Sequence, residues 1–191
     1  MQEDLITFDI EWLSLPKGEF RLLVMIADIG GDIKCLSNAC RYFGLRDDET
    51  STKDKMKEDL QSLADKGIIN LTKIKRRYYA TLNPIAEDNI ITIKREYLKT
   101  VMQRNYEAKV AWEQVLKCYL WLSSETKPDI IFTNNEISMA LNISTSTISK
   151  AKSPLKNEYN AVEIKKVKDK ISENDYRTRA QIAELNAWWE N

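Results

Sequence analysis

Two segments of the chain read almost alike, and this internal repeat is the feature that most limits how the chain can fold. Residues 6–13 read ITFDIEWL and residues 91–98 read ITIKREYL, at an offset of 85 residues. A second, weaker echo pairs residues 36–45, LSNACRYFGL, with residues 134–143, NNEISMALNI, at an offset of 98 residues. The two echoes occur in the same order, so we expect two copies of one small domain.

The turn signal Asn83-Pro84 lies between the two copies, because a residue that precedes proline disfavours helix. We therefore predict a first domain over residues 1–88, a second domain over 89–182 with a longer leading helix, and a C-terminal tail over 183–191. A chain of 191 residues can support two modest cores. No segment has the composition of a flexible linker.

Within the first domain, apolar residues three and four positions apart predict helices, and a basic hairpin is predicted at the end. Pro16 suits the first turn of the first helix, and Gly30-Gly31 is expected to end it. The elements expected after it are an extended piece over 33–36, helices over 37–43 and 50–66, and strands over 68–71 and 78–82 joined by a turn at 73–77.

The second domain opens with a strongly apolar helix, which is expected over residues 101–124. Its apolar stripe is wider than that of a single solvated helix. The excess is expected to pack against the first domain or a second subunit, or to form the core of its own domain. The sequence leaves these alternatives open.

A closely spaced pair of helices follows the apolar helix. Thr133 and Glu136 have the spacing of a capping box, which predicts the start of a helix. After a short turn, the next helix is expected to open at Ser144 or Thr145 and to end before Pro154. The second hairpin is expected from strands over 162–167 and 176–182 with a turn at 172–175.

Two strings of residues resemble known DNA-binding folds. Residues 63–83, LADKGIINLTKIKRRYYATLN, resemble the end of a winged helix domain, where a helix is followed by a basic hairpin. Residues 134–152, NNEISMALNISTSTISKAK, resemble the helix-turn-helix core of many bacterial DNA-binding proteins. The resemblance implies a mainly α fold with small β-hairpins (α+β), arranged as two tandem winged helix-turn-helix domains.

Contact with duplex DNA is expected from hydroxyl and basic side chains on these elements, because such groups bind phosphates and base edges. In a winged helix, the third helix faces the major groove and the hairpin meets phosphates or the minor groove. The contacts predicted on the second helix pair are Ser144, Thr145, Ser146, Thr147, Ser149, Lys150 and Lys152. Those predicted on the two hairpins are Lys73, Lys75, Arg76 and Arg77, and Lys165, Lys166, Lys168, Lys170, Arg177 and Arg179.

The charges do not favour DNA contact equally in the two domains. The chain has 29 basic and 29 acidic side chains, so its total charge does not predict nucleic-acid binding. Residues 66–80 hold five basic residues and no acid, whereas Asp47-Asp48-Glu49 precede a third helix that carries further acids. An acidic approach repels phosphates. The alternatives are a protein-docking role for the first domain and a merely solvated surface for the basic hairpins and the polar helix.

Missing residue types exclude much catalytic chemistry. The chain has no histidine, so it has no histidine general base, no Ser-His-Asp triad and no histidine-ligated zinc. Its five glycines form no phosphate-binding loop, and its three cysteines have no metal-binding spacing. We therefore expect no enzyme activity, no cofactor and no metal. The acidic N-terminus resembles no secretory signal, which predicts a cytoplasmic, nucleoid- or plasmid-associated protein without membrane contact.

The tandem arrangement has a counterpart in plasmid replication initiators. Residues 91–98, ITIKREYL, are similar to openings found in initiators of low-GC bacteria and their phages. The resemblance implies sequence-specific binding of double-stranded DNA for replication initiation or regulation on a plasmid, phage or other mobile element, with a homodimer or a host replication protein as further partners. A transcriptional regulator fits the same residues. Segregation and condensation protein B, a tandem winged helix interaction scaffold, resembles the chain in length and plan.

Overall fold

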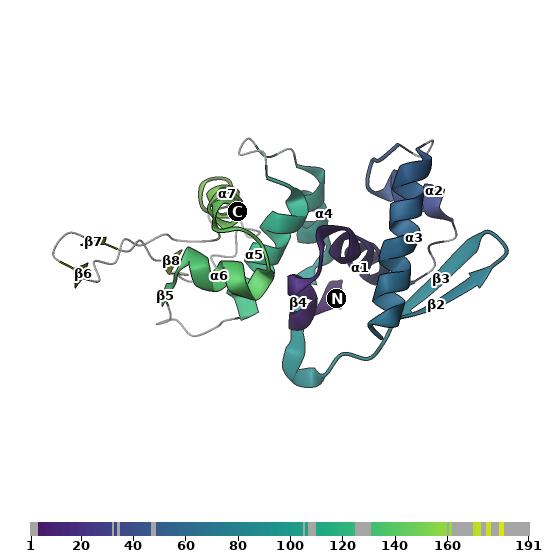
Figure 1. Ribbon diagram of the computed structural model, residues 1–191, viewed down its shortest axis with the longest axis horizontal. Coiled ribbons are helices and arrows are strands. Elements are labelled where there is room, and N and C mark those ends of the chain that lie inside the picture. Colours follow the sequence, from purple (N-terminus) through teal and green to yellow (C-terminus); the bar gives the residue numbers. More distant parts are fainter. Residues whose placement is uncertain are drawn as a thin grey trace. The chain divides into compact units, whose positions relative to one another are not determined.

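The computed structural model is a mixed α+β protein in which helices predominate (Figure 1). It describes residues 4–161 apart from 32, 34, 47–48, 105, 107–109, 125–130 and 160, and beyond these the short strands at 170–172, 175–176 and 180–181. The structure thus confirms the fold class that the sequence predicts, a mainly helical protein with small β-hairpins. Among the described residues, no helix is both long and apolar enough to cross a bilayer.

Contacts between residues divide the chain into two compact units. The N-terminal unit comprises residues 6–9 and 15–90, and the C-terminal unit comprises residues 1–5, 10–14 and 91–191. The main division therefore lies near residue 90, close to the boundary drawn from the sequence at residue 88. It assigns residues 1–5 and 10–14 to the C-terminal unit, whereas the sequence prediction kept all of 1–88 together.

The N-terminal unit is built around α1, which packs against α2, α3 and β3. Phe20, Leu23 and Val24 of α1 are fully buried, as their spacing predicts. The helix ends at Gly30, whose φ of 73° is a left-handed conformation that glycine adopts without steric cost. The described elements of the unit are β1 (Leu5–Asp9, all but its first residue), α1 (Lys17–Ile29), α2 (Leu36–Tyr42), α3 (Thr50–Asp65), β2 (Ile69–Ile74), β3 (Arg77–Leu82) and the 3-10 helix η2 (Glu87–Asn89).

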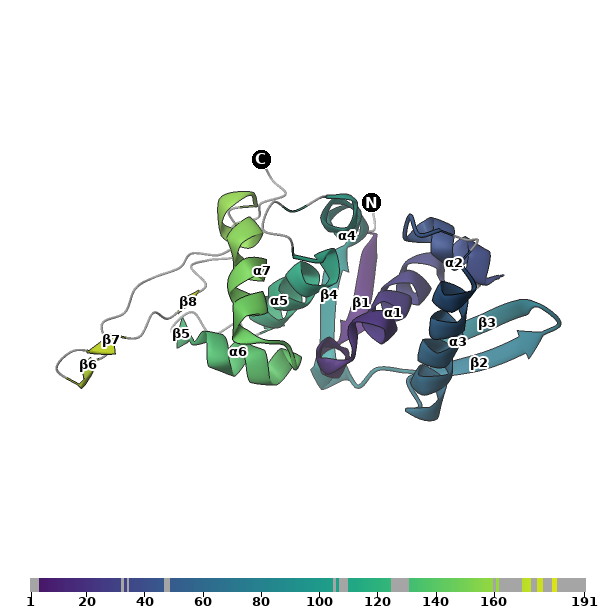
Figure 2. The same ribbon diagram turned by 45° about the horizontal axis from the view of Figure 1, so that its top comes forward.

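The strands β2 and β3 form an antiparallel hairpin whose last pair is Ile74 with Arg77. The turn is therefore two residues long, shorter than the predicted turn at 73–77. The base of the hairpin is held in the core: the Ala80 N–H donates to the Gly31 carbonyl at 3.0 Å, and a side chain at Gly31 would collide with the Ala80 carbonyl. The far end of the hairpin projects beyond α3 (Figure 2).

The C-terminal unit is built around α5, which packs against η1, α4, α6 and α7. Val115, Leu116 and Leu120 are fully buried there, so the wide apolar stripe forms the core of its own unit. The described elements of the unit are η1 (Ile10–Ser14), β4 (Ile90–Lys94, all but its first residue), α4 (Arg95–Gln103), α5 (Trp112–Ser124), β5 (Ile131–Phe132), α6 (Asn134–Leu141), α7 (Thr145–Asn157), β6 (Lys170–Ser172), β7 (Asp175–Tyr176) and β8 (Ala180–Gln181).

The single helix predicted over 101–124 is wrong, because the chain forms two helices there. Arg104 has extended backbone angles (φ −89°, ψ 135°) and ends α4. The interruption allows the buried Tyr106 to turn back into the core, where its hydroxyl donates to the Val101 carbonyl at 2.9 Å. The same hydroxyl lies 3.0 Å from that of the buried Tyr159, beyond the end of α7.

The end predicted for the helix after Ser144 is also wrong. Pro154 lies inside α7, which continues to Asn157. Proline removes one backbone donor from a helix, but Pro154 and Leu155 are both buried. Their packing therefore holds the helix where the local signal predicts its end.

The last strands pair in two places. β6 and β7 are antiparallel and Ser172 pairs with Asp175, so both ends of the turn predicted at 172–175 belong to strands. The single strand predicted over 176–182 is wrong, because β7 ends at Tyr176 and Ala180–Gln181 form β8, which pairs antiparallel with β5. The strand predicted over 162–167 lies outside the described residues, as does the tail over 183–191.

Candidate nucleic-acid interface

The candidate interface of the C-terminal unit consists of α6, the turn after it and the first half of α7. The Thr133 hydroxyl accepts a hydrogen bond from the Glu136 N–H at 3.2 Å, and the Glu136 carboxylate accepts the Thr133 N–H at 2.5 Å. The predicted capping box is thus confirmed. The helix ends at Asn142, whose φ of 53° is left-handed, and the Ile143 N–H donates to the Ser138 carbonyl at 3.2 Å. These bonds fix a tight turn into the next helix.

A group of hydroxyls opens α7. Ser144 is the N-cap, and its Oγ accepts the Thr147 N–H at 3.2 Å, which confirms the predicted start. The same oxygen lies 2.9 Å from Ser146 Oγ and 2.8 Å from Thr147 Oγ1. The hydroxyls lie at the end of the helix where the backbone dipole is positive.

The two faces of α7 differ in chemistry. Ile148, Ala151 and Leu155 are buried, and the helix packs against α5 and α6. The predicted contact residues on the other side are exposed, except Thr147, which is half-buried; the exposed ones are Ser144, Thr145, Ser146, Ser149 and Lys150. The sequence has no acidic residue between 137 and 157, so this face offers hydroxyls and a cation without a competing carboxylate of its own.

Lys152 is expected among the outward-facing DNA contacts of this helix, and this placement is wrong. Its side chain is only 6% exposed, because it follows Ile148 by four residues and precedes Leu155 by three, on the buried stripe of α7. Its ammonium donates a hydrogen bond to Oδ1 of Asn134, at the start of α6. Burial lowers the pKa of Lys152 below 10.5, an effect that interaction with Cys118 partly opposes. Burial also raises the pKa of the Cys118 thiol to about 12.

The candidate interface of the N-terminal unit is the end of the β2–β3 hairpin, residues 73–77, which we call the hairpin tip. Its four basic residues, Lys73, Lys75, Arg76 and Arg77, are all exposed. Lys75 has a left-handed φ of 56°, which allows the chain to reverse within two residues. Lys73 Nζ lies 5.5 Å from the ring centre of Tyr78. No acid occurs between residues 66 and 80, so the hairpin does not neutralise this charge itself.

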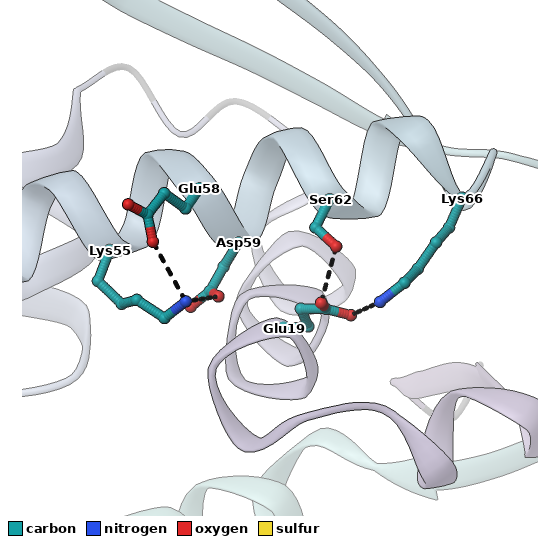
Figure 3. A network of polar contacts seen from close by, with 6 residues as sticks. All are labelled: Glu19, Lys55, Glu58, Asp59, Ser62 and Lys66. Atoms are coloured by element: carbon teal, nitrogen blue, oxygen red, sulfur yellow. Dashed lines mark hydrogen bonds and ion pairs between the residues drawn. The ribbon is translucent and has the colours of Figure 1, made fainter.

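Charged side chains along α3 pair with one another (Figure 3). Lys55 Nζ lies 3.2 Å from a carboxylate oxygen of Asp59 and 3.3 Å from one of Glu58. Hydrogen bonds to these two groups, the one to Asp59 first, raise the pKa of Lys55. Lys57 pairs with Asp54 at 2.5 Å, and this hydrogen bond raises the pKa of Lys57. These two lysines therefore already have anionic partners.

A second set of polar contacts fixes α3 to α1. The Ser62 hydroxyl donates to the buried carboxylate of Glu19 at 2.9 Å, and the Lys66 ammonium donates to the same carboxylate (Figure 3). Gly18 lies so close to Asp59 that a side chain at this position would overlap the Asp59 carboxylate. This side of α3 is thus occupied by packing within the unit.

The remaining predicted contacts lie beyond α7. Lys165, Lys166, Lys168, Arg177 and Arg179 are outside the described residues. Lys170 is the first residue of β6, and only its backbone is described.

Two exposed apolar residues beside these surfaces were not predicted. Met139 on α6 is 83% exposed, and Ile74 at the hairpin tip is 55% exposed. The alternation of a two-stranded hairpin could have identified Ile74, because Lys73 and Tyr78 lie on one face and Ile74 on the other.

No family model matches the chain, and no curated protein matches it significantly. Within the part of the chain that the structure describes, no three potential metal-ligating side chains gather in one place.

Proposed function

We propose that the chain binds double-stranded DNA and that α7 is the helix that enters the major groove. The observation that carries this proposal is the exposed face of α7, where Ser144, Thr145, Ser146, Ser149 and Lys150 lie together without an acidic neighbour on the helix. Hydroxyls bind either base edges or phosphates, and a lysine binds phosphate or guanine. The tight turn before α7 and its buried opposite face hold these groups on a fixed helix.

The element order supports a tandem winged helix-turn-helix arrangement as part of this proposal. In the N-terminal unit, α2 and α3 precede the β2–β3 hairpin, and in the C-terminal unit, α6 and α7 precede the paired strands β6 and β7. We assign the protein to replication initiation or regulation on a plasmid, phage or other mobile element. Transcriptional regulation requires the same duplex contact and is the alternative role. The proposal includes no catalytic step.

The test of DNA binding is selection of bound sequences from a random duplex pool at physiological salt. Recovery of a preferred sequence, with affinity that falls as salt increases, is the expected result. If no sequence is enriched and no complex forms even at low salt, DNA binding is refuted.

A second candidate function is protein docking by the N-terminal unit. It is favoured by α3, whose Lys55 and Lys57 pair with carboxylates of the same helix and whose Lys66 binds Glu19. A helix on which these three lysines are occupied in this way is poorly suited to bind phosphates. An N-terminal unit that holds a protein partner is compatible with a C-terminal unit that reads DNA.

A further inference from the structure

We propose that the hairpin tip is a wedge that inserts Ile74 between base pairs from the minor groove of a DNA duplex and bends the duplex at that step. This inference rests on the proposed function and extends it with a second kind of DNA contact in the N-terminal unit. The contact is apolar, whereas α7 offers polar groups.

Ile74 lies where a wedge would have to be. It is the last residue of β2, it pairs with Arg77 across the turn, and 55% of it is exposed. Successive residues of a strand point to opposite faces, so Ile74 shares the solvent face of the hairpin with Thr72 and the half-buried Tyr79, which pair with each other. Tyr78 and Ala80 occupy the other face and are buried in the core.

The charge around Ile74 identifies an anionic partner. Lys73 and Lys75 flank it in the chain, and Arg76 and Arg77 complete the turn. Four exposed cations within five residues repel one another and are stabilised by phosphates. Arginine and lysine side chains are attracted to the strong negative potential of a narrow minor groove. Proteins that bind the minor groove combine such cations with an apolar side chain, which they insert between two base pairs to unstack them.

The hairpin presents Ile74 on a fixed backbone. A two-stranded ribbon is wider than the minor groove of straight B-DNA, which is about 6 Å wide, so the Ile74 side chain on the solvent face enters the groove while the strands stay outside it. The strands pair without interruption from Ile69–Leu82 to Ile74–Arg77, and the bond from Ala80 to Gly31 anchors the base of the hairpin. A tip held in this way loses little conformational entropy when it binds.

The experiment compares Ile74→Ala with Ile29→Ala in the full chain. Ile29 is the last residue of α1 in the same unit and is 41% exposed, so the control removes the same apolar atoms from a similarly exposed position away from the tip. The probe is a duplex recovered by the selection described above. Dyes on its two ends report bending by energy transfer, and 2-aminopurine placed along the site reports unstacking.

We expect Ile74→Ala to weaken binding about tenfold, to reduce the bend and to abolish the 2-aminopurine signal, while Ile29→Ala behaves as the wild type. The slope of log affinity against log salt concentration, the salt slope, counts the counterions that binding releases. Ile74 releases none, so its loss should leave the salt slope unchanged, whereas Arg76→Ala should lower it by about 0.9.

Equal affinity, bend and 2-aminopurine signal in the Ile74→Ala and Ile29→Ala proteins would overturn the wedge and leave DNA binding by α7 intact. A wild-type protein that binds no duplex would overturn both proposals. If Ile74→Ala bends DNA like the wild type but no longer binds an acidic protein that the wild type binds, the hairpin tip is a protein-docking site instead.

Discussion

Replacement of Lys152 by methionine is expected to stabilise the protein although it removes a hydrogen bond. Lys152 is 6% exposed and donates to Asn134. Removal of an ammonium ion from water costs several kcal/mol, whereas a hydrogen bond from a charged donor returns about 1.5–3 kcal/mol. Methionine fills a similar volume with apolar atoms and leaves the half-buried Asn134 accessible to water.

We therefore expect Lys152→Met to raise the free energy of unfolding by about 1 kcal/mol at pH 7, measured by urea denaturation. Lys152→Ala is the matched comparison, because it removes the same charge but leaves a cavity. It should be about 2 kcal/mol less stable than the methionine variant.

The gap in free energy of unfolding between the wild type and Lys152→Met should depend on pH. Folding lowers the pKa of Lys152, so between that lowered value and the unfolded value of 10.5 the unfolded chain holds a proton that the folded chain has lost. The unfolded state then binds more protons, and the stability of the wild type rises with pH relative to the methionine variant. Urea denaturation at pH 7 and at pH 10 should therefore show the gap narrowing.

Two results would refute this reasoning. A methionine variant less stable than the wild type at pH 7 would mean that the bond to Asn134 outweighs the cost of burying the charge. A gap that stays constant up to pH 10 would mean that the pKa of Lys152 is not lowered. On DNA, Lys152→Met should keep the salt slope of the wild type, and a slope lower by about 0.9 would place Lys152 on a phosphate after all.

Two further predictions concern the packing of α1 on α3 and the turn before α7. Gly18→Ala should destabilise the protein by about 1–2 kcal/mol in urea denaturation, because the new methyl group overlaps the Asp59 carboxylate. In an Asp59→Ala background the same change should stabilise by about 0.5 kcal/mol through helix propensity, and a cost that persists there would contradict the overlap. Asn142→Gly should be nearly neutral and Asn142→Ala destabilising by about 1 kcal/mol, because φ is 53° at this residue; equal stability of these two variants in thermal denaturation would disprove the left-handed cap.

Local signals in the sequence predicted most of the elements that form the candidate sites. The capping box at Thr133 and Glu136, the start of α7 at Ser144 and the end of α1 at Gly30 depend on bonds between residues a few positions apart. Such bonds are determined by the local sequence, so the sequence alone is sufficient to locate them.

The errors arose where distant residues decide the outcome. Pro154 predicts a helix end, yet its burial with Leu155 in the core keeps α7 intact. The interruption between α4 and α5 allows Tyr106 to reach the hydroxyl of Tyr159, which is distant in the sequence, and no local pattern reveals this partner.

Lys152 is a different kind of error. Its position four residues after Ile148 predicts the buried stripe, whereas its charge predicts an exposed surface. The helical period was the better guide at this residue, because a lysine that finds the amide oxygen of Asn134 can occupy a buried position.

The salt dependence of DNA binding by a Lys150→Ala variant tests the central claim most directly. Lys156→Ala is the matched control, because Lys156 is an exposed lysine in the last turn of the same helix. Fluorescence anisotropy titrations of a selected duplex, repeated between 50 and 200 mM salt, give the slope of log affinity against log salt concentration. We expect Lys150→Ala to weaken binding and to lower the slope by about 0.9, while Lys156→Ala matches the wild type. Equal slopes and affinities for all three proteins would contradict the assignment of α7 as the DNA-binding helix.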